Sequence, residues 1–364
     1  MKIGIIGSRG IPNRYGGFEQ FAEHLAVGLS QKGLEVSVYC SHNHPYQKKT
    51  YKGVKLIKCY DPEDKIGIAG QFIYDLNCIL DSHKRDFDII YQLGYTSNGI
   101  WQWLLPGTSV ILTNMDGIEW QRSKYSPIIR TFLRYSEKLA ALRSHLLIAD
   151  SPVISEYLKK KYQIPIKYIT YGAKPVKETS KTKLYDLGLK PNQYFLIVAR
   201  LQPDNHIEEV IQGILLSESH NPLIIVGNHD SRYGNYLKKK YTDARIRFLG
   251  GVFDQLTLDS LRKYSKLYFH GHSAGGTNPS LLEAMAAGAK ICAHDNAFNR
   301  SVLKRNALYF SNSESVCEII SNNSKRDWLW EQSIENNLNK IRENHNWEAI
   351  IYNYFELFHK LDKS

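Results

Sequence analysis

Short apolar runs alternate with amphipathic helical patterns from the first residues of this 364-residue chain. An apolar strand over Lys2–Ile6 leads into a glycine-bearing loop, a helical pattern covers Phe18–Gln31, and a second strand spans Glu35–Cys40. These segments make a βαβ unit, and repeated alternation of this kind predicts a parallel sheet covered by helices on both faces. Further strands are expected at 54–58, 88–92, 109–113 and 145–149.

A polar segment near the middle of the chain interrupts this alternation. From Ile169 the sequence runs into YGAKPVKETSKTK, which has no hydrophobic period and is interpreted as an interdomain linker. A chain of this length suits two domains, each with its own core. A second strand–helix series follows, with strands expected at 194–199, 223–226, 245–248, 267–270, 290–292 and 308–310. We therefore predict an α/β protein of two Rossmann-like domains.

The C-terminal tail is helical in pattern from Ser324 to Leu361, with apolar residues recurring at helical spacing. These apolar faces need a surface to cover, and a terminal helix that crosses back onto the first domain would provide one. We expect an N-terminal domain over 1–170 together with a helix at 346–364, and a C-terminal domain over 171–345.

The amino-acid composition limits the kinds of protein that this chain can be. Apolar residues make up 43% and charged residues 23%, as in an average folded domain. No run approaches the roughly 18 apolar residues of a membrane-spanning helix, and the amino-terminal run is too short for a signal peptide, so we expect a cytoplasmic protein. The cysteines are widely spaced and form no C-x-x-C pair, which disfavours disulfides and a zinc site. They are Cys40, Cys59, Cys78, Cys292 and Cys317.

The formal net charge of +11 favours partners that carry phosphate, which include nucleic acid, an anionic membrane and a nucleoside diphosphate. No nucleic-acid-binding module is recognisable, so nucleic acid is disfavoured. One segment, from Trp120 to Arg143, holds six basic residues against a single acidic one, Glu137. Such a helix could lie on an anionic membrane, with Arg130 and Arg134 among its contacts, or it could be an ordinary solvated face.

The loop after the first strand runs from Gly7 to Gly17 and joins a strand to a helix. Backbone N–H groups and the helix dipole can hold a phosphate in such a place. Its glycine spacing departs from G-x-G-x-x-G, and the second strand ends in Cys40-Ser41 without the acidic residue that binds ribose in dinucleotide-binding units. An NAD-dependent enzyme is therefore disfavoured.

The most specific segment is HGHSAGGTNPSLLEAMAAG at 270–288, which follows a predicted strand. Thr277 or Asn278 is placed to cap a helix, Pro279 suits its first turn and Gly288 its end. The amino end of such a helix binds anions, and Glu283 could accept hydrogen bonds from ribose hydroxyls. The alternative is a well-capped helix with a solvated glutamate.

Six segments resemble family 4 of the retaining glycosyltransferases, and in particular its bacterial branch of rhamnosyltransferases and related polysaccharide enzymes. They are GSRGIPNRYGGFE at 7–19, TNMDGIEW at 113–120, ADSPVI at 149–154, VARLQPDN at 198–205, the segment at 270–288, and AHDNAFNR at 293–300. The resemblance implies the GT-B fold, in which two Rossmann-like domains face a central cleft and a C-terminal helix crosses back to the first domain. It places the donor nucleotide on the second domain and the acceptor on the first.

The same resemblance implies roles for individual residues. Those implied in catalysis are Asp116, Arg200 and Glu283. Those implied in donor binding are Gly16, Gly17, Arg200, Asn205, Gly227, Asn228, His272, Gly275, Gly276, Thr277, Asn278, Ser280 and Glu283, and those implied in acceptor binding are Arg9, Tyr15, Asp116, Glu119 and Trp120. The chain departs from the wider family in two places: Gly275 replaces a glutamate, and Asn205 replaces a lysine. Arg200 is therefore expected to carry most of the charge that faces the diphosphate.

The implied reaction is transfer of a sugar, with rhamnose from dTDP-rhamnose favoured and UDP-sugars as the alternative, to a saccharide acceptor that is lipid-linked through polyprenyl diphosphate. No cofactor is expected besides this donor. The grouping of His270, His272, His294 and Asp295 could suggest a metal, but no D-x-D run ends a strand and we expect no metal site. A nucleotide-sugar epimerase of the same fold is the alternative enzyme, and it would act without an acceptor.

Overall fold

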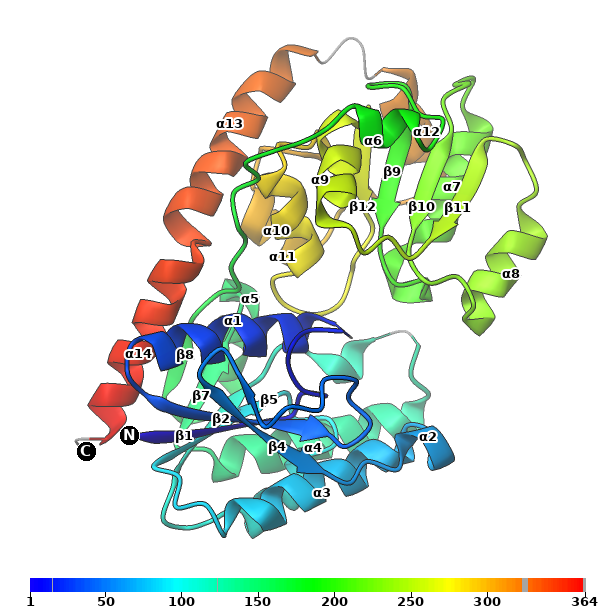
Figure 1. Ribbon diagram of the computed structural model, residues 1–364. Coiled ribbons are helices and arrows are strands. Elements are labelled where there is room, and N and C mark those ends of the chain that lie inside the picture. The colour runs from blue at the N-terminus through cyan, green and yellow to red at the C-terminus, as the bar shows by residue number, and fades with distance from the viewer. Residues whose placement is uncertain (15, 123, 323–326, 363–364) are drawn as a thin grey trace. The chain divides into compact units, whose positions relative to one another are not determined.

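The computed structural model describes residues 1–14, 16–122, 124–322 and 327–362 (Figure 1). The chain divides into two compact units. The first contains residues 1–121, 125–171 and 347–364, and the second contains residues 122–124 and 172–346. The boundaries expected from the sequence, 170 and 345, each differ from these by one residue, whereas the short segment 122–124 was not expected in the second unit.

The first unit is built on an eight-stranded sheet with the order β3-β4-β2-β1-β5-β6-β7-β8. All neighbouring strands are parallel except β3 and β4. The strands are β1 (Lys2–Ile6), β2 (Glu35–Ser41), β3 (Thr50–Tyr51), β4 (Val54–Cys59), β5 (Ile89–Leu93), β6 (Val110–Asn114), β7 (Leu146–Ala149) and β8 (Ile166–Tyr168). The sequence patterns did not predict β3 or β8, which are two and three residues long.

Helices cover both faces of this sheet (Figure 1). They are α1 (Gly17–Gln31), α2 (Glu63–Ile66), α3 (Ala69–Ser82), α4 (Pro127–Arg143), α5 (Pro152–Lys161) and α14 (Trp347–Asp362), with short 3-10 turns η1 (Gly99–Leu104) and η2 (Glu119–Gln121). Successive side chains of a strand point to opposite faces of the sheet, so neighbouring residues of β5 pack against different helical layers. Ile90 joins a core with Tyr74 of α3, whereas Tyr91 contacts Phe21 of α1 and Tyr354 of α14.

Helix α14 is the last element of the chain and packs on α1 in the first unit. The hydroxyl groups of Tyr91 and Tyr354 lie 2.8 Å apart, and both side chains are buried. Trp347 stacks on His24 with ring centroids 4.5 Å apart. The predicted C-terminal helix that crosses back to the first domain is therefore confirmed, since α13 (Asp327–Asn344) belongs to the second unit.

The second unit contains a six-stranded parallel sheet with the order β11-β10-β9-β12-β13-β14. Its strands are β9 (Phe195–Val198), β10 (Leu223–Val226), β11 (Ile246–Gly250), β12 (Leu267–His270), β13 (Ile291–His294) and β14 (Leu308–Phe310). Its remaining helices are α6 (Thr182–Tyr185), η3 (Pro203–Asn205), α7 (Ile207–Leu216), α8 (Arg232–Lys240), α9 (Gln255–Tyr264), α10 (Pro279–Ala286), α11 (Ala297–Leu303) and α12 (Ser313–Ser321). The predicted fold of two Rossmann-like α/β units is confirmed.

Each sheet has one point where the strand order reverses direction. In the first unit the chain leaves β1 towards β2 on one side, and β5 pairs with β1 on the other. In the second unit β9 leads to β10 on one side and pairs with β12 on the other. Loops that follow such a pair of strands diverge and leave a crevice beyond their carboxyl ends, where open α/β sheets bind ligands. The two switch points therefore indicate where to look for a site in each unit.

The contact between α1 and α14 leads to a stability prediction. A Cβ added at Gly28 of α1 would overlap the side chain of Ile351 of α14. Alanine normally favours a helix over glycine by about 1 kcal/mol. We nevertheless expect Gly28→Ala to lower the free energy of unfolding by about 1–3 kcal/mol, because overpacking forces the two helices apart. Urea titration of the purified variant measures the change.

The matched control is the same substitution in an Ile351→Ala background, where the space is already open. There Gly28→Ala is expected to be neutral or stabilising. An equal loss in both backgrounds would show that the cost does not come from the contact with Ile351.

Candidate functional site

Two loops of the second unit meet beyond the carboxyl ends of β9 and β12. The loop after β9 carries Arg200, which is exposed, and Asn205. The loop after β12 carries His272 and Ser273. Ser273 donates to the carbonyl oxygen of Asp204 from both its backbone nitrogen, at 3.1 Å, and its hydroxyl, at 2.9 Å. The switch point therefore brings together residues that are about 70 positions apart in the chain, as parallel pairing of the strands requires.

Asn205 fixes the orientation of His272. Its side-chain nitrogen donates to the carbonyl oxygen of Arg200 at 2.6 Å, so its amide oxygen faces Nδ1 of His272, 2.9 Å away. Nδ1 therefore carries the proton, and Nε2 is an acceptor. Burial lowers the pKa of His272 well below its usual range, and the charges of His270, Arg122 and Arg200 lower it further. A neutral imidazole thus lies beside the arginine that is predicted to bind the diphosphate.

Gly275 allows the loop after β12 to fold closely over this imidazole. Its φ of 109° lies in the region that favours glycine. A Cβ at this position would lie 3.1 Å from Nε2 of His272 and 3.3 Å from Nη2 of Arg122. The glutamate found here in the wider family would therefore not fit without rearrangement of the loop.

Helix α10 begins immediately after this loop and is anchored to the sheet. Oδ1 of Asn278 accepts from the backbone nitrogen of Ser280 at 2.9 Å, and Pro279 occupies the first turn. The Ser280 hydroxyl contacts the carbonyl oxygen of Val198 at 3.1 Å and the hydroxyl of Tyr268 at 3.0 Å. The capping pattern predicted from the sequence therefore sets the amino end of α10 against β9 and β12.

The loop after β10 approaches the same edge of the sheet. A Cβ at Gly227 would overlap the carbonyl oxygen of Ala199, so only glycine lets the two loops lie in contact. Asn228 is exposed, and its Oδ1 accepts from the backbone nitrogen of Asp230 at 3.0 Å. Both residues lie on the loop next to the one that carries Arg200.

Glu283 lies on α10 and has a partner that sequence reasoning missed. Nη2 of Arg262, on α9, lies 2.5 Å from its Oε2, and the guanidinium also contacts Asp259. Arg262 follows Leu258 by four residues and so lies on the apolar stripe of its helix, where a charged residue is unusual. That position is the only sequence signal that could have identified it.

Asp116 is the first-unit residue predicted to act in catalysis. Its φ of 37° is uncommon for a residue with a side chain. Its backbone nitrogen donates to Oδ1 of Asn114 at 2.9 Å, and the hydroxyl of Tyr171 donates to its carboxylate at 3.0 Å. The strained turn after β6 is thus held on both sides, a feature found at many functional sites.

Glu119 and Trp120 follow on the same loop and are packed into the first unit. The backbone nitrogen of Glu119 donates to the hydroxyl of Tyr95 at 2.9 Å, and its side chain is buried. Nε1 of Trp120 donates to Glu137 at 3.0 Å, while the guanidinium of Arg134 lies over its ring, 4.1 Å from the centroid. These contacts give Trp120 a packing role, and its predicted role in acceptor binding stays a prediction.

The loop after β1 has its polar groups paired with carboxylates of the first unit. The backbone nitrogen of Arg9 donates to Glu19 at 2.8 Å, and its guanidinium pairs with Asp61 and Glu63. The backbone nitrogen of Asn13 donates to Glu23 at 2.7 Å. These carboxylates weigh against a phosphate in this loop. Gly16 and Gly17 begin α1 in the first unit, and Tyr15 lies outside the described residues.

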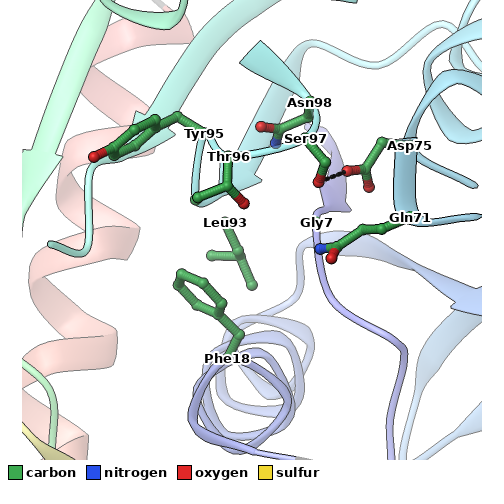
Figure 2. A pocket seen from close by; sticks show the side chains of 10 residues that line it. Gly7, Phe18, Gln71, Asp75, Leu93, Tyr95, Thr96, Ser97 and Asn98 are labelled. Atoms are coloured by element: carbon green, nitrogen blue, oxygen red, sulfur yellow. Dashed lines mark hydrogen bonds between the residues drawn. The ribbon is translucent and has the colours of Figure 1, made fainter. Parts of the chain in front are cut away.

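A small cavity of about 30 Å³ lies at the switch point of the first unit (Figure 2). Its lining comes from the loops after β1 and β5 and from α1 and α3, and includes Gly7, Phe18, Gln71, Asp75, Thr96 and Ser97. The volume suits one or two groups of the size of water or a hydroxyl. Burial raises the pKa of Asp75 to about 7, although the hydroxyl of Ser97, 2.5 Å away, and the charge of Arg9 oppose this shift. Sequence analysis did not identify Asp75, because a single polar residue in a helix carries no signal.

The histidines of the second unit do not gather around one point. His206 and His294 stack with ring centroids 3.8 Å apart, and burial lowers the pKa of His294 to about 4. His270 is buried, and burial lowers its pKa to about 3. Within the described ranges, no three His, Cys, Asp or Glu side chains are arranged to hold a metal ion.

Two known families match the chain, and the boundary between the two matches lies close to the boundary between the two structural units. Residues 1–174 match a family described as a domain of unknown function (DUF1972), and residues 181–320 match the family of glycosyl transferases group 1. An uncharacterized glycosyltransferase of Methanocaldococcus jannaschii, MJ1069, is 24% identical over 243 residues, which cover 62% of this chain. The chain spans 60% of the length of that relative.

Solved structures resemble the chain over nearly its whole length. Sucrose-phosphate synthase of Thermosynechococcus elongatus has a TM-score of 0.82 at 16% identity, covering 99% of this chain and 98% of that one. HepE of Anabaena, crystallised in complex with UDP and glucose, has a TM-score of 0.77 at 18% identity, covering 99% and 100%. The fold is therefore GT-B.

The buried carboxyl of Asp75 leads to a prediction about pH and stability. Its pKa is higher in the folded protein than in the unfolded chain, where it is near 3.8, so its contribution is fully present below pH 4 and is lost as the pH rises through about 7. Arg9 and Asp61 are the other charged groups that act on it. Wild type loses this contribution between pH 4 and pH 8, whereas Asp75→Asn has no such group to titrate. The free energy of unfolding of Asp75→Asn, relative to that of wild type, is therefore expected to rise by on the order of 3 kcal/mol over this range.

Urea titration of both proteins across this pH range measures the difference. Asp64→Asn removes an exposed carboxyl from the same unit and is the matched control, for which no such trend is expected. A stability difference between wild type and Asp75→Asn that does not change with pH would contradict the prediction.

Proposed function

We propose that this protein is a retaining glycosyltransferase that transfers a sugar from a nucleoside diphosphate to a saccharide acceptor in cell-surface polysaccharide synthesis. The observation that carries the proposal is that exposed Arg200 and the capped amino end of α10 both lie at the switch point of the second sheet. A guanidinium and the amino end of a helix are two groups that bind phosphate in proteins. The match of 181–320 to glycosyl transferases group 1 supports the same assignment.

The charge that develops in the reaction explains this choice of residues. As the bond from the anomeric carbon to the diphosphate breaks, negative charge grows on the leaving group, and fixed cations and N–H dipoles stabilise it. Arg200 and the backbone of residues 275–277 are the proposed source of this stabilisation. Asn205 is an uncharged amide that holds His272, so it does not replace the charge of the lysine that the resemblance implies for the wider family. Asp116 is proposed to face the acceptor hydroxyl or the donor sugar.

The donor is proposed to be dTDP-rhamnose, on the basis of the sequence resemblance. The structural likeness to HepE, which was crystallised with UDP and glucose, supports UDP-sugars as the alternative. A thymidine donor lacks the 2′-hydroxyl, so Glu283 would bind only its 3′-hydroxyl. Retention of anomeric configuration is likewise carried over from the resemblance.

The acceptor is proposed to be a saccharide linked to polyprenyl diphosphate, held by the first unit. Its switch point offers the cavity beside Asp75, which is large enough for a hydroxyl or hydroxymethyl group. Ser97 and Gln71 provide polar groups on one side, and Phe18 provides an aromatic ring on the other (Figure 2). An aromatic face beside polar groups suits a sugar, whose own surface is amphipathic.

A ligand-binding experiment and a kinetic experiment test the donor site. We expect dTDP or UDP to raise the melting temperature of the wild-type protein, because a ligand that binds only the folded state stabilises it. Glu283→Ala should remove most of this shift. Arg200→Ala should lower kcat with dTDP-rhamnose or UDP-sugars by about 10²–10³-fold, the size of effect seen when one transition-state donor is removed.

The matched control for Arg200→Ala is Arg305→Ala, which removes an exposed arginine elsewhere in the same unit and should leave kcat unchanged. A melting temperature that responds to no nucleotide diphosphate would refute the proposed function.

The outer face of α4 supports a membrane-bound acceptor. Its only acidic residue, Glu137, is buried and accepts from Lys161 at 2.7 Å, so the residues left exposed are basic or apolar apart from Thr131. The exposed basic residues of α4 are Arg134, Lys138 and Arg143. Exposed apolar side chains on α4, the adjoining η1 and the segment before α3 are Ile128, Ile129, Tyr135, Leu142, Trp103 and Ile68. None of the described helices is long and apolar enough to span a bilayer.

Basic and apolar side chains on one face are typical of a surface that lies on anionic lipid. We expect the protein to co-sediment with phosphatidylcholine vesicles that contain phosphatidylglycerol, and expect Lys138→Glu with Arg143→Glu to abolish this. These two residues are preferred to Arg130 and Arg134, because Arg134 stacks on Trp120 and Nε of Arg130 is buried.

The control pair is Lys32→Glu with Lys360→Glu, which makes the same change of charge on the α1 and α14 layer. This pair should still co-sediment. Equal sedimentation of wild type with neutral and anionic vesicles, or no sedimentation with either, would contradict the membrane proposal.

A further inference from the structure

Arg262 of α9 is among the largest fully buried side chains of the described residues, with 1% of it exposed. An arginine side chain stays charged, and burial of an unpaired charge is costly. Two carboxylates accompany it: Nη2 lies 2.5 Å from Oε2 of Glu283, and Nη1 lies 3.3 Å from Oδ1 of Asp259. Since a buried ion pair is often no more stabilising than apolar packing, a purely structural role explains this arrangement poorly.

The two partners differ in how far they reach the surface. The side chain of Glu283 is 24% exposed, whereas that of Arg262 is 1% exposed. The carboxylate therefore occupies the outer position and the guanidinium lies behind it. Arg262 is too deeply buried to touch a ligand at the surface, but it determines the direction in which Glu283 points.

The neighbouring turn of α10 is supported in a similar way. Ser280 lies three residues before Glu283, and its hydroxyl is contacted by the buried Tyr268 at 3.0 Å. Both polar side chains on this face of α10 are thus held from within the unit. Residues that preorganise a site commonly form such a supporting layer.

The charges of the group are mutually dependent. Burial by itself lowers the pKa of Arg262, but the charge of Glu283 is the largest of the effects that raise it, and the net shift is upward. Tyr268 and Asp259 add smaller contributions in the same direction.

We propose that Arg262 is a positioning residue for the nucleotide, and that it holds Glu283 in the orientation that accepts hydrogen bonds from the ribose hydroxyls of the donor. This inference rests on the proposed function, because it takes Glu283 as the residue that binds the pentose. A carboxylate already fixed by a guanidinium loses little side-chain freedom when the ligand binds, which favours binding. The forked guanidinium can contact two carboxylates at once, whereas a lysine ammonium offers no such fork.

Comparison of ribose and deoxyribose nucleotides tests the proposal. The ligands are UDP against 2′,3′-dideoxyuridine diphosphate, and dTDP against 3′-deoxythymidine diphosphate, with affinities from isothermal titration calorimetry. Wild type is expected to prefer the hydroxylated member of a pair by about tenfold, the size of a hydrogen bond to a charged group. In Glu283→Ala and in Arg262→Gln this preference should fall to within about twofold.

Two further variants separate positioning from folding. Arg262→Lys keeps the charge, so it should remain folded if Arg262→Gln does not, and it should recover part of the preference. Asp259→Asn removes the partner that does not reach the ribose and should keep the full preference. A general structural defect would instead lower the affinity for both members of each pair by the same factor.

The outcomes distinguish the inference from the proposed function. Loss of the ribose preference in Glu283→Ala but its retention in Arg262→Gln and Arg262→Lys would overturn the role of Arg262 and leave the proposed function standing. Failure of wild type to bind any of these diphosphates would overturn both. Equal loss of the preference in Glu283→Ala and Arg262→Gln, with partial recovery in Arg262→Lys and retention in Asp259→Asn, is the result expected here.

Discussion

The candidate sites depend on how parallel strands leave the middle of each sheet. Because β9 and β12 pair in parallel, the loops after them start at the same edge of the sheet and meet there, although they lead to strands on opposite sides of this pair. Arg200 on one loop and the amino end of α10 after the other are brought together in this way. The same constraint acts on β1 and β5 in the first unit, where the cavity beside Asp75 lies. Neither site depends on a special insertion; both follow from strand order.

Contacts between groups of the second unit fix the geometry of its candidate site. The amide of Asn205 determines the tautomer of His272, and the neutral ring does not repel a cationic neighbour. The absence of a side chain at Gly275 and Gly227 lets backbone segments approach each other closely. Such contacts reduce the freedom that a ligand would otherwise have to remove on binding.

In the first unit, one buried carboxylate organises an otherwise basic region. Glu137 accepts from Trp120, Tyr157, Lys161 and Tyr162, which ties α4 to α5 and to the loop that follows Asp116. With this acid turned inward, the outer face of α4 keeps its positive charge. The same interaction therefore stabilises the loop after β6 and gives the surface of α4 its basic character.

The sequence by itself determined both Rossmann-like sheets, the capped start of α10 and the terminal helix that packs on the first unit. Each of these depends on local hydrophobic period or capping chemistry, which adjacent residues express. Tertiary structure alone decided that Arg262 supports Glu283, that Trp120 packs under Arg134, that Asp75 is buried beside a cavity, and that residues 122–124 join the second unit. Those facts depend on which side chains meet across elements that are distant in sequence, and a single buried charge in a helix does not reveal its partner until the helices are packed.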